Sequence, residues 1–200
     1  MKYIKRLFLM LIIICCGLLV YKFLIAKNNN IEKVYVVNSI DKYGYTLYSN
    51  NTEPFRKYFN SLDTLLNTEN YDEKEYASLV AKLFIIDFYT LENKSSNLDI
   101  GGTQFVHSKI LNNFKLKSKE TIYRYVENNI YGDRNQDLPY VTEVNIDNID
   151  VKKINNSEFS DQNSYYIDVS IEYKKDLGFD SKKSIILVHE NEKLSLVSIN

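Results

Sequence analysis

The residue of this chain best suited to acid–base chemistry is Asp87, which lies within the apolar run FIIDFY (84–89). Burial in such surroundings raises the pKa of a carboxyl group and would let it act as a general base. No partner base or oxyanion donor accompanies it, so an exposed Asp87, or one paired with a tyrosine or lysine, is the competing interpretation. Asp87 is therefore a pocket candidate only, and we predict no catalytic residue.

Two histidines, His107 and His189, are the next candidates. They show neither H-x-x-x-H nor H-E-x-x-H spacing, so a zinc site would require convergence of residues far apart in the chain. Residues 28–200 contain no cysteine, which excludes disulfides and cysteine metal sites there. We interpret both histidines as ordinary surface or core residues and predict no metal and no cofactor.

Two loops resemble ligand-binding motifs only in part. GDRNQD (132–137) begins like a calcium loop, but Leu138 and Val144 occupy the positions that require glycine and glutamate. LDIGG (98–102) lacks the spacing of phosphate-binding loops, and its glycines indicate backbone freedom before a helix. We therefore predict that both segments are connections between structural elements.

The N-terminal segment is the clearest functional signal. Residues 7–26 form a 20-residue apolar stretch whose only charge is Lys22. As a helix this stretch is about 30 Å long, which matches the hydrocarbon core of a bilayer. Lys2, Lys5 and Arg6 precede it, so we expect a cytoplasmic N-terminus and a C-terminal domain outside the cytoplasm.

A cleaved signal peptide and a lipoprotein are the alternatives to an uncleaved anchor. The chain stays apolar as far as Ala26, and Leu24-Ile25-Ala26 is a poor cleavage site. Ile14 precedes Cys15, so the small residue that lipidation requires is missing there. We interpret Cys15 and Cys16 as small apolar residues of a membrane helix.

Charge is distributed unevenly along the chain. Residues 1–27 contain five of the 25 cations and no acid, so residues 28–200 contain 20 cations and 26 acids, a net charge of −6. An acidic body lacks the basic surface that binds phosphate backbones. We therefore predict no nucleic-acid partner.

The body of the chain shows a helical period first and a strand period afterwards. After the spacer 28–30, β segments are predicted at 32–40 and 43–49 around Asp41-Lys42. Apolar residues at helical spacing then predict four helices, and alternation predicts four antiparallel strands. The helices are expected at 52–66, 72–92, 103–114 and 118–128, and the strands at 141–154, 164–173, 183–190 and 193–199.

Many tyrosines lie in the predicted β segments. Tyr43 and Tyr45 share one face of their strand and Tyr48 falls on the other, while Tyr165 and Tyr166 lie in the sheet. Such rings are favoured at protein interfaces, but they also line half-exposed sheets. Both interpretations remain open from the sequence.

The order of elements predicts an α+β fold, with helices packed on a curved antiparallel sheet of about four strands, a cone-shaped roll. It resembles the nuclear transport factor 2 superfamily and, more narrowly, extracytoplasmic domains of single-pass subunits in bacterial conjugation and type IV secretion machines. The expected domains are an anchor (1–27), a spacer with a small β element (28–49) and an α+β domain (50–200).

The resemblance implies a non-enzymatic, membrane-anchored scaffold in the bacterial cell membrane, with protein partners or further copies of itself. A tethered small-ligand binder or hydrolase that uses Asp87 is the alternative function.

Overall fold

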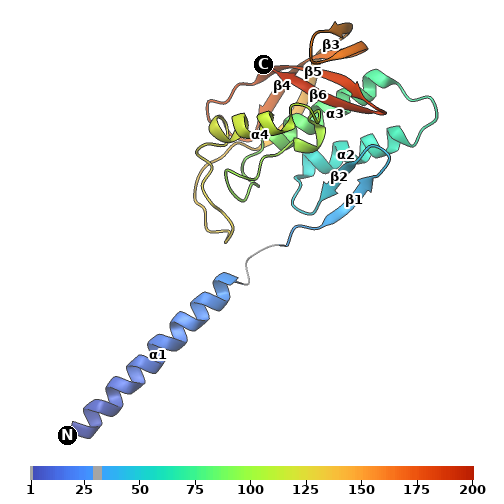
Figure 1. The fold of residues 1–200 in the computed structure, drawn as a ribbon. Coiled ribbons are helices and arrows are strands. Elements are labelled where there is room, and N and C mark those ends of the chain that lie inside the picture. The colour runs from blue at the N-terminus through green and yellow to red at the C-terminus, as the bar shows by residue number, and fades with distance from the viewer. Residues whose placement is uncertain (1, 29–32) are drawn as a thin grey trace. The chain divides into compact units, whose positions relative to one another are not determined.

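The computed structural model describes residues 2–28 and 33–200. Contacts divide the chain into two compact units: residues 1–33 with 129–135, and residues 34–128 with 136–200. The second unit contains almost all of the helices and strands (Figure 1). The α+β fold predicted from the sequence is confirmed.

The first unit contains helix α1 (Lys2–Asn28). Among the described residues, Tyr3–Lys22 is long and apolar enough to cross a membrane, although a signal sequence would meet the same criterion. This stretch begins and ends four residues before the predicted span, 7–26. Residues 29 and 30 of the predicted spacer lie outside the described residues.

The sheet consists of β3 (Val141–Asn155), β4 (Ser160–Tyr173), β5 (Lys182–Glu190) and β6 (Lys193–Ile199), antiparallel and in that order. In β4 the alternation buries Tyr165, Ile167, Val169 and Ile171, as the sequence predicts. Asn191 adopts a positive φ of 60° in the tight turn between β5 and β6. All four predicted strands are confirmed.

Helices α2 (Glu53–Leu66) and α3 (Glu73–Tyr89) form the second layer, and α3 contacts β3, β4 and β5 (Figure 1). The Asp72 side chain accepts a hydrogen bond from the Lys74 N–H, 2.8 Å away, which caps the start of α3. Eleven of the 17 residues of α3 are buried, so it is the central helix that its broad apolar surface predicts.

Strands β1 (Val36–Ile40) and β2 (Tyr45–Tyr48) form a hairpin that is fixed to this core. The hydroxyl of Tyr45 donates to the carbonyl oxygen of Leu194 at 3.0 Å and lies 2.8 Å from the hydroxyl of Tyr76. The hairpin belongs to the same compact unit as residues 50–128. That unit therefore extends across the domain boundary we expected at residue 50.

Two predicted helices are wrong in position. Residues 103–114 contain the 3₁₀ helix η1 (Thr103–Phe105), and α4 begins only at Leu111 and ends at Glu120. Between them, Val106 pairs with Leu196 of β6, so tertiary hydrogen bonding overrides the helical pattern. The helix predicted at 118–128 is replaced by turns that bury Tyr123.

Candidate functional site

Asp87 forms an ion pair within the domain. Its Oδ1 lies 2.6 Å from the Nζ of Lys94, and the two side chains are only 14% and 5% exposed, respectively. Its Oδ2 accepts a hydrogen bond of 2.7 Å from the N–H of Gly102. Both carboxylate oxygens therefore have a partner. Asp87 is one half of an ion pair with a lysine, which was the competing interpretation from the sequence.

The two glycines of LDIGG allow this close approach. A Cβ at Gly101 would lie 2.1 Å from the carbonyl oxygen of Asp87, and Gly102 has φ +71° against the ring of Phe84. The cavity beside Asp87 measures about 180 Å³, below the roughly 300 Å³ typical of small-molecule sites. The backbone of LDIGG therefore fixes the position of the Asp87 side chain. The cavity has room for a few water molecules.

His189 lies between two carboxylates. Its Nε2 is 2.8 Å from Glu73 Oε1 and its Nδ1 is 2.8 Å from Asp161 Oδ2, while the Tyr165 hydroxyl donates to Glu73 Oε2 at 2.7 Å. The network joins the first turn of α3, the start of β4 and the end of β5. It therefore connects the helical layer to the sheet.

The network favours the charged forms of His189, Glu73 and Asp161. Burial would lower the pKa of His189, but hydrogen bonds to Glu73 and Asp161 outweigh it and raise that pKa. Burial alone would raise the pKa of both carboxyls, but bonds from His189 lower them. Because each ring nitrogen faces a different carboxylate, neither nitrogen can serve as the free base that catalysis needs.

His107 is a neutral, buried side chain. Its Nδ1 accepts a hydrogen bond of 3.2 Å from the Lys109 N–H, and burial lowers its pKa despite the nearby Glu190. The 3.6 Å separation from the Glu190 carboxylate is therefore not an ion pair. Across residues 2–28 and 33–200, no three His, Cys, Asp or Glu side chains are grouped to hold a metal.

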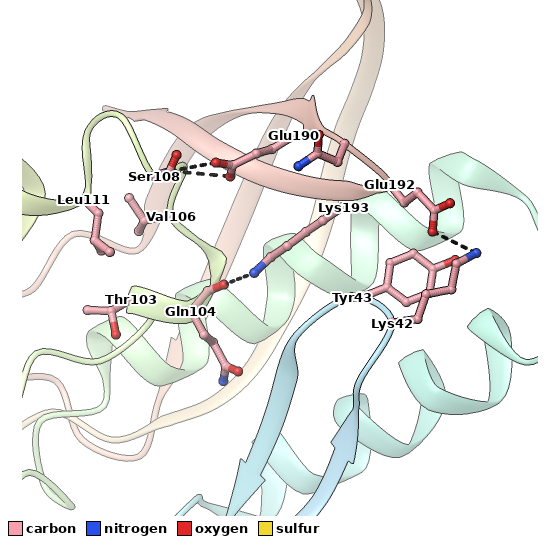
Figure 2. Close-up of a pocket in the computed structure, with 11 residues that line it drawn as sticks. Lys42, Tyr43, Thr103, Gln104, Val106, Ser108, Leu111, Glu190, Glu192 and Lys193 are labelled. Atoms are coloured by element: carbon pink, nitrogen blue, oxygen red, sulfur yellow. Dashed lines mark hydrogen bonds and ion pairs between the residues drawn. The ribbon is translucent and has the colours of Figure 1, made fainter.

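One recess on the domain is a groove of about 610 Å³, which we call the mixed-charge groove. Figure 2 shows its walls: the β1–β2 turn, the segment that contains η1, and the β5–β6 turn. These segments are far apart in sequence: the hairpin packs on the core, and the segment that contains η1 pairs with β6. Its charged lining residues are Lys42, Glu190, Glu192 and Lys193.

The charges of the groove are held in place. Glu190 accepts a 3.1 Å hydrogen bond from the Ser108 N–H, and although burial would raise its pKa, such bonds lower it. Lys193 donates to the Gln104 carbonyl oxygen at 2.6 Å, and its Nζ lies 4.8 Å from the centre of the Tyr45 ring. Lys42 and Glu192 pair across the rim at 3.0 Å. The groove thus presents ordered charges of both signs (Figure 2).

The remaining sequence candidates have structural roles. Tyr43, Tyr45 and Tyr165 are buried, Tyr166 is half-buried and Tyr48 is 40% exposed, so of this group only Tyr48 and Tyr166 retain surface for an interface. Asp137 of the calcium-like loop pairs with Lys175 of another segment. Glu73, Asp161, Glu190 and Lys193 were not anticipated, although Glu190 follows His189 directly in the sequence.

We predict that Asp87→Asn destabilises the domain by about 3–5 kcal/mol, because it removes the carboxylate that faces the buried ammonium of Lys94. The measurement is chemical unfolding of the full chain in detergent micelles, followed by near-ultraviolet circular dichroism of the tyrosines. Asp87→Asn combined with Lys94→Met is the matched control, and it is expected to recover most of the loss. A single variant as stable as the parent would contradict the structural role.

We predict that stability falls as pH rises through the pKa of His189. A raised native pKa means that protonated His189 stabilises the fold fully below its ordinary value of 6.5, and that this contribution is lost as pH rises through the native value. Unfolding free energies measured from about pH 5 to pH 9 test this.

Two variants separate the histidines in this measurement. His189→Gln is expected to remove the decline at high pH. In His107→Gln the decline is expected to persist, because the pKa of His107 is lowered and its linkage has the opposite sign. If the decline in unfolding free energy persists unchanged in His189→Gln, groups other than His189 cause it.

Comparison of the chain with protein-family models, curated proteins and solved structures gave no match. The likeness to transport factor 2 rolls and secretion subunits therefore stays a prediction from element order.

Proposed function

We propose that this chain is a single-pass membrane protein whose extracytoplasmic domain binds another protein. The observation that carries the proposal is the mixed-charge groove, in which ordered charges of both signs line an open recess of about 610 Å³. Fixed, complementary charges give specificity and orientation to protein contacts. The groove suits a polypeptide segment of the partner that carries both acidic and basic residues.

Several features favour binding over catalysis at this groove. A general base works best when its pKa is near the operating pH, whereas hydrogen bonding lowers the pKa of Glu190 and keeps it ionised. The Lys193 ammonium already donates to a backbone carbonyl oxygen. The carboxylate of Asp87, on which the hydrolytic alternative is based, already accepts hydrogen bonds from Lys94 and Gly102. These contacts support a scaffold or assembly subunit.

Helix α1 supplies the second part of the proposal. A membrane anchor confines the domain to two dimensions and raises its effective concentration near other membrane proteins. Such confinement makes a groove of modest affinity sufficient for assembly. The resemblance in element order extends the proposal to a bacterial transfer or secretion machine, with the N-terminus in the cytoplasm.

Site-specific photocrosslinking in native membranes tests the proposal. A photoreactive residue at the exposed position Asn191, inside the groove, is expected to form an adduct with a defined partner protein. The same residue at Asp176, exposed outside the groove, is the control and is expected to give no such adduct.

A charge swap sharpens this test. Lys42→Glu combined with Glu192→Lys keeps the rim ion pair but reverses its direction, so stability should change by less than about 1 kcal/mol. The adduct at Asn191 is expected to weaken several-fold. Equal adducts at both positions, or an adduct insensitive to the swap, would contradict recognition through the groove.

A further inference from the structure

Four exposed apolar side chains form a continuous surface on the domain, which we call the apolar face: Val34, Tyr48, Leu98 and Leu116. Val34, Tyr48 and Leu98 line one shallow hollow, and Leu98 and Leu116 line the next. Leu98 is 67% exposed and Leu116 56%. Contiguous apolar surface of this kind marks a contact site for a protein or a membrane.

The apolar face is not a by-product of loose packing. The opposite side of the same hairpin buries Tyr45 and Leu47 completely or nearly so. The outer edge of β2 is also closed, because the Gln104 carboxamide accepts from the Thr46 N–H at 2.7 Å and donates to the Thr46 carbonyl oxygen at 3.1 Å. The hairpin thus separates a well-packed inner side from an exposed apolar outer side.

Lysines border this face. Lys115 and Lys119 line the same hollow as Leu116, one helical turn apart on α4. The acid in that hollow, Asp99, accepts hydrogen bonds from the N–H of Ser95 at 2.9 Å and from its hydroxyl at 3.1 Å. The hollow therefore contains two lysines and one carboxylate, and this local excess of positive charge complements an anionic surface although the body as a whole carries −6.

The covalent chain limits how far Val34 can lie from the end of α1. Val34 is the first residue of the domain, and only five residues separate it from Asn28, the last residue of α1. Such a connection reaches at most about 21 Å in any conformation. Val34, one residue of the apolar face, is therefore tied by a short connection to the helix that we propose as a membrane anchor.

We infer that the apolar face docks on the lipid bilayer, with Leu98 and Leu116 in the interface and Lys115 and Lys119 against anionic headgroups. The inference rests on the proposed membrane anchor but not on the mixed-charge groove. Docking would restrict the domain to one orientation on the membrane. Tyr48 contributes an aromatic ring of the kind that favours the headgroup region.

Spin labels on the full chain in lipid vesicles test this inference. Cys15 and Cys16 are first replaced by alanine, and one label is then introduced through Leu98→Cys or Leu116→Cys. The matched control is Val151→Cys, an exposed apolar position on β3 outside the face. The accessibility of each label to oxygen and to a water-soluble nickel complex is compared in vesicles with about 30% phosphatidylglycerol and in neutral vesicles.

In anionic vesicles, labels at Leu98→Cys and Leu116→Cys are expected to be more accessible to oxygen than to the nickel complex, and the label at Val151→Cys the reverse. Lys115→Glu with Lys119→Glu should reduce the docked fraction by roughly fivefold or more. If all three labels stay equally accessible to water while the protein floats with the vesicles, the apolar face does not dock on the bilayer. The proposal that α1 anchors the protein would be unaffected by that result. A chain that fails to float would overturn the anchor as well.

Discussion

The attachment of the first hairpin to the core is the interaction on which the other features depend. Tyr45 reaches Tyr76 of α3 and the backbone of Leu194 in β6, and the Leu194 N–H in turn donates to the Tyr76 hydroxyl at 3.1 Å. Burial raises the pKa of Tyr76 to about 12, so this hydroxyl stays protonated and can donate. Without this attachment, the mixed-charge groove would lose one wall and the apolar face would lose Val34 and Tyr48.

Charge inside the domain is used mainly to fix geometry. Asp87 with Lys94 fixes the segment that follows α3, and His189 with Glu73 and Asp161 joins the helical layer to the sheet. Such networks are costly when incomplete, because an unpaired buried charge is strongly destabilising. The charges of the mixed-charge groove also have partners, but they line an open recess. For this reason we propose the groove as the recognition site and give the two charge networks a structural role.

The sequence predicts elements well where local pattern and packing agree. The alternation in β4 and the broad apolar surface of α3 are properties of short segments, and both were confirmed. The helix expected at 103–114 failed because Val106 pairs with Leu196, some 90 residues away, and no local pattern encodes that bond. The network around His189 escaped detection for the same reason: Glu73, Asp161 and His189 are separated by at least 28 residues.

Amide hydrogen exchange on the full chain measures whether the hairpin is an integral part of the domain. We expect amides of β2, including the Thr46 N–H bonded to Gln104, to exchange only through global unfolding, with the same opening free energy as buried amides of α3. Exchange of β2 orders of magnitude faster, with α3 still protected, would show that the hairpin opens on its own. That result would contradict both the groove and the apolar face as preformed surfaces.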